Sequence, residues 1–407
     1  MNEYILTFGH IPKFLGGRQS SGLSYVMWKI ASTINQTKTD LKVVFVSTDI
    51  FIDNSKIENT EVLGWNKKLL LKYIYRHLFY FINIFIHCVV LSCRFRLKFI
   101  TTLAKLVFYD YSFRYYNNRV KVVHVHGVNN YIILTYLINK YKKKAVLTIH
   151  GITGLDKNIP RWKTQNRLEK FVSVQRNLSE IVFVTTETKT VWINTYGLPY
   201  AEVSVILNGL DSKQFYFCPN KIQKRNHEIV NILTIGSIIK LKGQERVLKA
   251  LSELPEERKR VFRYCMIGTG RKSEIDYLLD FAKAKNINVN YLEYCYPENL
   301  NSILHETDYL IQPSSTEGFG LVFLESIACG TPVIVPRNLP IAMEGDILNR
   351  TNSIKITDYS SEAIRDCLVC LQPWQISRKE VSQSVTKYDW KTVASQYISV
   401  FDKLIGS

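Results

Sequence analysis

The residues best suited to chemistry lie in one stretch, Ser314 to Gly330, which reads SSTEGFGLVFLESIACG. Two glutamates, Glu317 and Glu325, stand in it, and Gly318 and Gly320 lie between them. Glycines at the start of a helix leave backbone amides uncovered, and these amides, with the positive end of the helix dipole, bind phosphate. The stretch therefore offers a loop carboxylate, a phosphate site and a second carboxylate further along the chain.

Apolar runs on both sides place this stretch in a strand, helix, strand unit. One run, Asp308 to Gln312, precedes it and the other, Pro332 to Val335, follows it, as expected for a helical crossover between parallel strands. Glu317 is then in the loop after the first strand. Glu325 is about two turns into the helix, at 3.6 residues per turn.

The apolar neighbours of Glu325 indicate that its helix is buried. Carboxylates are seldom buried without a partner, and the two hydroxyl donors of a ribose would be such a partner. A nucleotide sugar laid along the start of the helix would suit the whole stretch. The simpler interpretation is that Glu317 is a loop charge and Glu325 a solvated charge on the helix.

Length and composition indicate a globular protein of two domains. The chain has 407 residues, which is too long for one ordinary core, and 46% of them are hydrophobic and 22% charged. The N-terminus lacks the basic start and long apolar run of a signal peptide and is typical of a first strand.

The eight cysteines are scattered along the chain. Cys367 and Cys370 form the one close pair, inside an apolar pattern with Ile364 and Leu368 that favours the core face of a helix. No second pair completes a tetrahedral site. We therefore expect no metal, no disulfide framework and a reducing cytoplasm.

The net charge of +18 is concentrated in the first half of the chain. Residues 1–200 carry 28 Lys and Arg against 11 Asp and Glu, whereas residues 201–407 carry 25 against 24. The first half therefore holds the basic surface, for which nucleic acid and anionic membrane are both candidate partners on charge alone.

Short apolar runs alternate with helical segments in both halves, which predicts two parallel, doubly wound sheets. The expected strands are Tyr4 to Phe8, Lys42 to Ser47, Val120 to His126, Ala145 to His150, Ile181 to Thr185, Val203 to Leu207, Ile229 to Gly236, Arg263 to Gly268, Val289 to Glu293, Tyr309 to Pro313 and Pro332 to Pro336. The polar, irregular stretch Phe217 to His227 separates the halves. The amphipathic segment Asp389 to Leu404 is expected to cross back to the first domain.

The segment Leu69 to Tyr109 departs from this alternation. Its centre, Leu78 to Cys93, is apolar and aromatic with basic residues on both sides, and Asn83 and His87 interrupt it. Its sixteen residues are short for a membrane span, which needs about 20. The pattern favours a helix in a membrane interface; a buried core helix and a spanning helix are the alternatives.

Histidines end two of the expected strands. His124 and His126 alternate along VVHVHG, and His150 ends the next strand. Ligands gather at the carboxyl ends of parallel strands, so His126 and His150 are candidate site residues. A structural role, or a His-x-His metal site, is the alternative.

Several stretches together resemble the retaining GT-B glycosyltransferases of family 4. In the second half, EGFGLVFLE matches that family's E-x7-E signature and ACGTPVIV its continuation, while IGSIIKLKG matches the G-R-x-x-x-x-K-G phosphate loop and IGTGR the next glycine turn. NGLDSKQF matches the N-G-[VI]-D-x-x-x-F segment. The two histidine strands match as well. One position departs: Ser237 stands where the family has arginine. Ser237 supplies one weak donor in place of a bidentate guanidinium, unless Lys240 or Arg18 substitutes.

The resemblance implies a role for each matching residue. Glu317 would bind the hydroxyls of the donor sugar, Glu325 the ribose and Lys242 the diphosphate, where its charge would offset that of the leaving group. His150 would touch the sugar near the reacting carbon. The remaining donor-binding positions are Gly236, Ser237 and Gly268, the backbone of Gly318, Phe319, Gly320 and Leu321, and Gly16 and Gly17, which would close over the phosphates from the other domain.

The fold implied is α/β, with two Rossmann-like domains facing a cleft (GT-B). We expect an N-terminal acceptor-binding, membrane-facing domain over residues 1–212, completed by 389–407, and a C-terminal nucleotide-sugar-binding domain over residues 213–388. The C-terminal helix would cross back to the first domain.

The function implied is a retaining, metal-independent hexosyltransferase without a cofactor. Its donor would be a nucleotide-diphosphate sugar, a UDP-sugar before GDP-mannose. Its acceptor would be a glycan or lipid-linked oligosaccharide at the cytoplasmic face of an anionic membrane, in surface polysaccharide biosynthesis such as that of lipopolysaccharide or capsule. The alternatives are a catalytically inactive GT-B protein that binds a membrane or partner, and a GT-B epimerase or phosphorylase. No nucleic-acid recognition motif is evident, so no nucleic-acid partner is expected.

Overall fold

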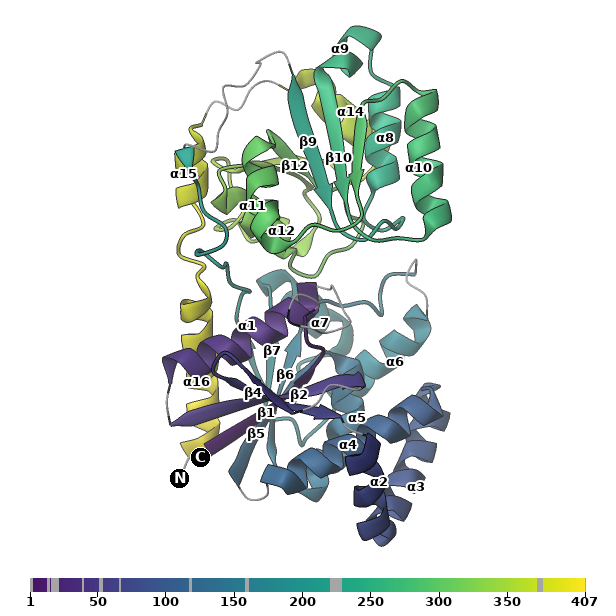
Figure 1. Cartoon of the computed structure of the whole chain (residues 1–407), viewed down its shortest axis with the longest axis vertical. Helices are drawn as coiled ribbons and strands as arrows, with labels where there is room; N and C mark the ends of the chain where they lie inside the picture. Colours follow the sequence, from purple (N-terminus) through teal and green to yellow (C-terminus); the bar gives the residue numbers. More distant parts are fainter. Residues whose placement is uncertain are drawn as a thin grey trace. The chain divides into compact units, whose positions relative to one another are not determined.

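The computed structural model describes residues 3–12, 15, 22–38, 40–50, 54–65, 67–116, 119–157, 161–219, 229–371 and 376–406. Contacts divide the chain into two compact units, Met1–Gly209 with Trp390–Ser407 (unit 1) and Leu210–Asp389 (unit 2). The sequence placed these boundaries at 212/213 and 388/389. Each unit is a parallel α/β sheet covered by helices, so the predicted pair of Rossmann-like domains is confirmed (Figure 1).

Unit 1 is built on an eight-stranded sheet of order β3-β4-β2-β1-β5-β6-β7-β8. All neighbouring strands are parallel except β3 and β4. The elements are β1 (Glu3–Gly9), α1 (Gly22–Thr37), β2 (Leu41–Ile50), β3 (Ser55–Ile57), β4 (Thr60–Trp65), α2 (Lys67–Arg76), α3 (Leu78–Phe95), α4 (Phe99–Tyr116), β5 (Val120–His126), α5 (Val128–Lys140), β6 (Lys144–Ile149), α6 (Trp162–Ser173), β7 (Glu180–Phe183), α7 (Thr186–Tyr196), β8 (Glu202–Val205) and α16 (Trp390–Gly406).

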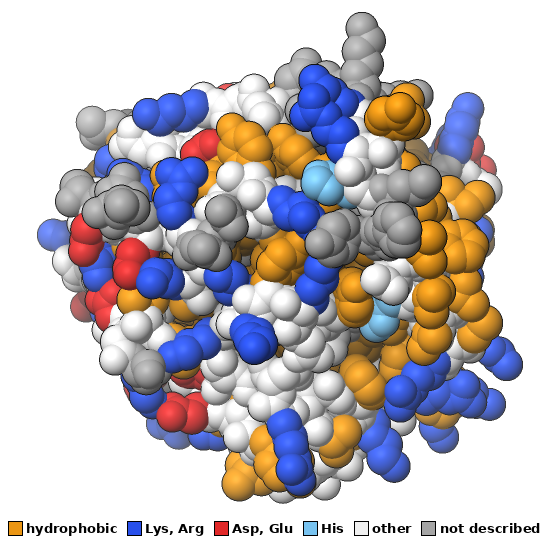
Figure 2. All heavy atoms as spheres, turned by 90° about the horizontal axis from the view of Figure 1, so that it is seen from below, with side chains coloured by type: hydrophobic (Ala, Val, Ile, Leu, Met, Phe, Trp, Pro, Cys, Tyr) orange, Lys and Arg blue, Asp and Glu red, His pale blue; other side chains and the backbone are white. Residues whose placement is uncertain are grey.

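The unusual segment after β4 forms the three helices α2, α3 and α4. One face of α3 is buried, and its members recur at helical spacing: Ile84, Cys88, Leu91 and Phe95. The outer face is apolar as well, and its side chains are 38% to 54% exposed: Ile82, Phe85, Ile86, Val89 and Val90. Figure 2 shows hydrophobic side chains gathered at the right of the molecule with lysines and arginines beside them. Within the described residues, every helix is too short or too polar to cross a membrane.

A buried carboxylate ties these helices to the rest of unit 1. Asp110 of α4 accepts hydrogen bonds from the hydroxyl of Tyr73 in α2, from Lys140 Nζ of α5 at 2.7 Å and from the hydroxyl of Tyr141 at 2.7 Å. Burial opposes the charge of Asp110, but the donors Lys140, Tyr73 and Tyr141 outweigh it and lower the pKa of its carboxyl. These hydrogen bonds therefore link α2 and α4 to α5.

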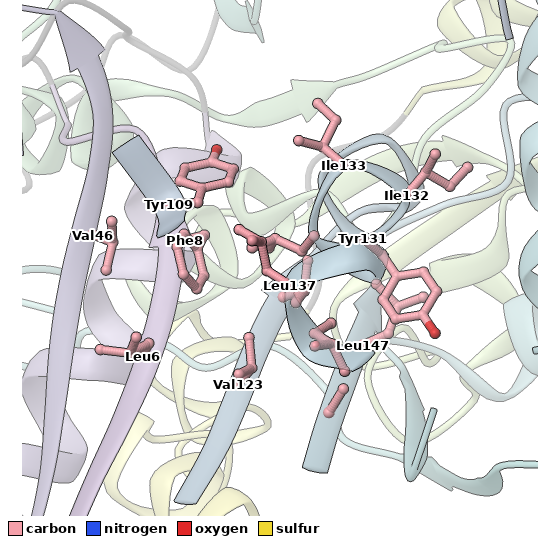
Figure 3. Packing of buried hydrophobic residues seen from close by; sticks show 14 of the residues in the cluster. Leu6, Phe8, Val46, Tyr109, Val123, Tyr131, Ile132, Ile133, Leu137 and Leu147 are labelled. Atoms are coloured by element: carbon pink, nitrogen blue, oxygen red, sulfur yellow. The ribbon is translucent and has the colours of Figure 1, made fainter. Parts of the chain in front are cut away.

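The core of unit 1 fixes the strand ends that carry the histidines. Phe8 of β1, Val123 of β5 and Leu147 of β6 are fully buried and pack beneath Leu137 of α5, and the ring of Tyr109 in α4 lies edge-on to Phe8 with centroids 4.7 Å apart (Figure 3). Strands covered on both faces become continuous apolar runs. This is why the sequence indicated β1, β5 and β6 clearly.

The C-terminal helix α16 completes unit 1. It packs against α1, the hydroxyl of Tyr397 lies 3.1 Å from that of Thr148 in β6, and Lys144 Nζ donates to the carbonyl of Leu404 at 2.7 Å. The predicted return of the chain to the first domain is confirmed.

Unit 2 is a six-stranded parallel sheet of order β11-β10-β9-β12-β13-β14. Its elements are β9 (Val230–Ile235), α8 (Gln244–Ser252), α9 (Glu256–Val261), β10 (Phe262–Ile267), α10 (Lys272–Ala284), β11 (Val289–Leu292), α11 (Pro297–Glu306), β12 (Tyr309–Ile311), α12 (Leu321–Ala328), β13 (Val333–Pro336), α13 (Pro340–Met343), β14 (Ser353–Ile356), α14 (Ser361–Cys370) and α15 (Arg378–Gln383). The chain winds one way from β9 and the other way from β12, so a topological switch point lies between these two strands. Ligands of such sheets bind outside the carboxyl ends of the strands at the switch point.

Candidate active site

The switch point of unit 2 brings together two loops that are far apart in the sequence. β9 and β12 are neighbours, so the loop after β9, residues 236–243, and the loop after β12, residues 312–320, leave the same edge of the sheet. The amide of Ser315 donates to the carbonyl of Leu241 at 2.8 Å, which joins the loops directly. Lys242 and Glu317, one from each loop, are therefore held beside each other.

Lys242 and Glu317 form an ion pair. Lys242 Nζ lies 2.5 Å from Glu317 Oε2, and the hydroxyl of Ser314 donates to the same oxygen at 3.2 Å. The side chains of Lys242 and Glu317 are 24% and 14% exposed, so the pair is screened from bulk water but still reachable. A phosphate that enters the site could form an ion pair with the ammonium group of Lys242. The carboxylate of Glu317 would then be free to accept hydrogen bonds from hydroxyl groups.

Two glycines allow the chain to pack closely around this site. Gly268, after β10, has φ +158, and a Cβ there would lie 1.9 Å from the carbonyl oxygen of Gly236. Gly320, with φ +76, precedes α12, and no side chain caps that helix. The side chain of Phe319 is buried, so this residue can offer only its backbone to a ligand. The uncapped amides at the start of α12 are the group that the sequence analysis expects to bind phosphate, and this role stays a prediction.

Within the described residues, the loop after β9 contains no arginine that could bind a phosphate. Ser237 is exposed, and its carbonyl accepts from the side-chain amide of Gln244 at 3.2 Å. Arg246 of α8 donates hydrogen bonds to the carbonyls of Lys240 at 2.9 Å and Pro313 at 2.6 Å. Its guanidinium therefore links the loop after β9 to the loop after β12. The sequence motif did not indicate this role. Arg18, considered as a substitute cation, lies outside the described residues.

Glu325 carries an unusual carboxylate. α12 begins at Leu321, so Glu325 lies little more than one turn from the start of the helix, and the expected two turns were wrong because the helix begins later than the motif suggested. Glu325 is partly buried, and within the described chain no hydrogen bond or ion pair reaches its carboxylate. Burial, and then the charge of Asp211, raises the pKa of Glu325 to about 7. Such a carboxylate favours a ligand that brings hydroxyl donors.

In unit 1, His150 directly follows β6 and lies beside His126, the last residue of β5. His126 Nδ1 and His150 Nε2 are 2.9 Å apart. His124, two residues before His126, has Nε2 2.9 Å from the hydroxyl of Thr148, which is 3.1 Å from that of Tyr397. Burial lowers the pKa of His150 to about 4 and that of His124 to about 3. The imidazoles of His124 and His150 are therefore neutral at physiological pH.

The loop that follows His150 is held by a buried glutamate that the sequence analysis missed. Glu169 of α6 accepts from the amides of Thr153 at 3.0 Å and Gly154 at 3.2 Å and from the hydroxyl of Tyr196 at 2.8 Å. Burial raises the pKa of its carboxyl in spite of these donors. Its position within the amphipathic run of α6 gave no signal, because the amides that it binds belong to a loop.

The structure brings Lys242 and Glu317 together in unit 2 and His150 and His126 together in unit 1. Gly16 and Gly17 lie outside the described residues, so their role stays a prediction. No group of three or more His, Cys, Asp or Glu in the described ranges could hold a metal ion. Cys367 and Cys370 are free cysteines on α14. The neighbouring Ile364 and Leu368 are buried as expected, but Cys367 is only partly buried and Cys370 is exposed, so the expected core face does not include Cys370.

Comparisons with known proteins agree with this geometry. The family model described as "Glycosyl transferases group 1" matches residues 220–344, and that described as "Glycosyltransferase Family 4" matches residues 69–214. Curated relatives include glycogen synthase of Mycobacterium tuberculosis (28% identical; 51% of this chain, 50% of that protein), an O-antigen biosynthesis glycosyltransferase of Escherichia coli (24%; 60% and 70%) and D-inositol 3-phosphate glycosyltransferase of Corynebacterium diphtheriae (34%; 41% and 41%). The chain spans about half the length of the first of these relatives.

Solved structures share the fold over almost the whole chain. Sucrose-phosphate synthase of Thermosynechococcus elongatus has a TM-score of 0.74 at 14% identity, with all of both chains covered. HepE of Anabaena, solved in complex with UDP-glucose, has a TM-score of 0.70 at 15% identity, with 98% of this chain and 99% of that chain covered. With these neighbours, its two Rossmann-like units and family matches over about two thirds of its length, the chain belongs to the GT-B glycosyltransferases of group 1 and is family 4-like.

Proposed function

We propose that the protein is a retaining, metal-independent hexosyltransferase that takes a hexose from a nucleotide-diphosphate sugar. The observation that carries this proposal is the Lys242–Glu317 pair at the switch point of unit 2, beside the uncapped start of α12. A UDP-sugar is the first candidate donor and GDP-mannose the second. The structure of HepE with UDP-glucose supports this order. No cofactor is needed for this chemistry.

Each residue has a task in the proposed reaction. Lys242 moves from Glu317 to the diphosphate and offsets the negative charge that grows on the leaving group. The amides of Gly318 to Leu321 bind the phosphate. Glu317, once released, accepts from hydroxyls of the sugar, and Glu325 accepts from those of the ribose. Neutral His150 contributes a hydrogen bond to the sugar. Gly16 and Gly17 would close over the phosphates.

Slow hydrolysis of the donor in the absence of an acceptor tests this function. We expect the protein to release hexose from a labelled UDP-hexose. We also expect UDP to raise the midpoint of thermal unfolding, because a ligand that binds the native state stabilises it. GDP-mannose and an ADP-sugar serve as the comparison donors.

The same assay separates the alternatives. Binding of a nucleotide without hydrolysis would identify an inactive GT-B binding protein. An epimerised nucleotide sugar, or sugar release that requires inorganic phosphate, would identify an epimerase or a phosphorylase. If no nucleotide shifts the unfolding midpoint and no donor is cleaved, the proposed function is wrong.

We further propose that the acceptor is a glycan or lipid-linked oligosaccharide at the cytoplasmic face of an anionic membrane, with the protein peripherally bound there. The exposed apolar face of α3 supports this proposal, because a fully buried core helix would have no such face. Exposed Arg94, Arg96 and Lys98 follow it along the chain. Apolar side chains beside basic ones suit the interface of a membrane with anionic lipids. Surface polysaccharide biosynthesis is the process that fits such an acceptor, and the O-antigen enzyme among the relatives supports it.

A charged residue on the outer face of α3 is expected to weaken membrane binding. Val90 is 51% exposed in the protein. Val90→Asp should lower partitioning to anionic vesicles by about tenfold or more, because the variant no longer buries this apolar side chain in lipid and adds a negative charge. Vesicle co-sedimentation at low and high salt measures the effect. Val369→Asp is the matched control, since Val369 lies on α14 of unit 2 and is 47% exposed. Equal partitioning of the unaltered protein to neutral and anionic vesicles would count against the proposal.

A further inference from the structure

We propose that His126 is a positioning residue that holds His150 in the tautomer with its proton on Nδ1. This inference rests on the proposed function, in which His150 touches the donor sugar. His126 Nδ1 and His150 Nε2 are 2.9 Å apart, and the two rings stack with their centroids 5.2 Å apart and their planes 26° from parallel. One of these two nitrogens must donate to the other.

Both rings are neutral, so each carries a single proton. Burial lowers the pKa of His126 well below its ordinary value, with smaller contributions from His124 and His150, and burial lowers the pKa of His150 to about 4. The pair therefore has two arrangements. Either His126 Nδ1–H donates to His150 Nε2, or His150 Nε2–H donates to His126 Nδ1.

The other nitrogen of His126 decides between them. His126 Nε2 is buried and finds no hydrogen-bond partner in the described part of the chain. On the adjacent strand β6, the hydroxyl of Thr148 is engaged by His124 and Tyr397, and on the adjacent strand β1, the buried hydroxyl of Thr7 makes no hydrogen bond within the described residues. If His126 carried its proton on Nε2, a buried N–H would be left without an acceptor, which is rarer in native proteins than an unsatisfied acceptor. The proton of His126 is therefore on Nδ1, and it is donated to His150.

This arrangement fixes what His150 can do. A histidine whose Nε2 accepts a hydrogen bond must carry its own proton on Nδ1, since the bond made by one ring nitrogen sets the state of the other. His150 is only partly buried, and no group in the described ranges bonds its Nδ1. His150 therefore offers a neutral N–H donor to a sugar oxygen, in an orientation set by the buried ring of His126.

Nitrogen NMR of the full chain with ¹⁵N-labelled histidine tests the proposal. His150→Gln identifies the signals of His150 by their loss. In the unaltered protein we expect His150 to be protonated on Nδ1. His126→Asn keeps an N–H donor near the former Nδ1 and should preserve this tautomer, whereas His126→Leu should release it to Nε2.

Turnover should follow the tautomer. We expect His126→Leu to lower donor hydrolysis by about 10- to 100-fold, the range known for groups that orient metal-bound histidines in other proteins, and His126→Asn to recover most of the loss. Protonation of His150 on Nε2 in the unaltered protein overturns the inference, and so does an unchanged tautomer in the Leu variant. If the Leu variant does not fold, the spectrum of the unaltered protein still shows which nitrogen of His150 carries the proton. Because the spectrum needs no turnover, failure to cleave any donor would refute the proposed function and leave this test intact.

Discussion

Lys242→Ala is expected to lower cleavage of the nucleotide-sugar donor by about 10²- to 10³-fold, the usual cost of removing one preorganised group that stabilises developing negative charge. Lys242 is the cation that the structure holds against Glu317 at the switch point, and the position beside Gly236 that the family fills with arginine is Ser237 here. The remaining cation of that loop, Lys240, is exposed. We therefore expect that neither Ser237 nor Lys240 replaces the charge of Lys242, and that the variant shows the full loss of donor cleavage.

Initial rates of donor hydrolysis measure this effect, and thermal unfolding shows that the variant still folds. Lys283→Ala on α10 is the control, because Lys283 is an exposed lysine of the same unit. It should retain the full rate. A near-normal rate for Lys242→Ala would refute the phosphate-binding role of this residue.

Glu325→Gln is expected to stabilise the ligand-free protein while it weakens nucleotide binding. The folded-state pKa of Glu325, about 7, is raised from the ordinary value of 4.5. The native state therefore binds more protons than the unfolded state between these two values, and stability falls as the pH rises through this window. Since one pKa unit corresponds to about 1.4 kcal/mol, the carboxylate costs up to about 3 kcal/mol above pH 7.

Denaturant titrations at pH 5 and pH 8 measure this cost. The Gln variant should be more stable than the unaltered protein by less than about 1 kcal/mol at pH 5 and by about 1–3 kcal/mol at pH 8. Its affinity for UDP should fall about tenfold, because charge-assisted hydrogen bonds to the ribose become neutral ones. Glu257→Gln on α9, an exposed glutamate, is the control and should change neither quantity. Equal stability of the Gln variant and the unaltered protein at pH 8 would mean that the carboxylate has a partner.

Most strands could be predicted because the sheets are parallel and covered on both faces. Such strands are continuous apolar runs, as the fully buried β7 and β12 show. Strands β3, β4 and β14 were not expected from the sequence. β3 is exposed along most of its length, and β14 has only four residues, of which only the first and the last are buried, so neither forms a continuous apolar run.

The candidate site could be predicted in part. Its glycines, its lysine and its two glutamates follow from local motifs, but the ion pair joins Lys242 to Glu317, 75 residues away. That contact depends on β9 and β12 being neighbours, which is a property of the sheet order. Arg246 and Glu169 were missed for the same reason, because each binds the backbone of a loop that is distant in sequence.

The apolar segment around α3 shows a different limit. Its composition indicated an interface helix, but composition does not say which face is buried. The structure separates the faces, with Cys88 fully buried and Ile86 54% exposed.

A crystal structure of the chain with UDP tests most directly whether Lys242 and Glu325 bind the nucleotide. We expect the diphosphate to lie on Lys242 and the amides at the start of α12, with Glu317 released from Lys242 and the ribose hydroxyls on the carboxylate of Glu325. A nucleotide bound elsewhere, with the Lys242–Glu317 pair still intact, would contradict this expectation.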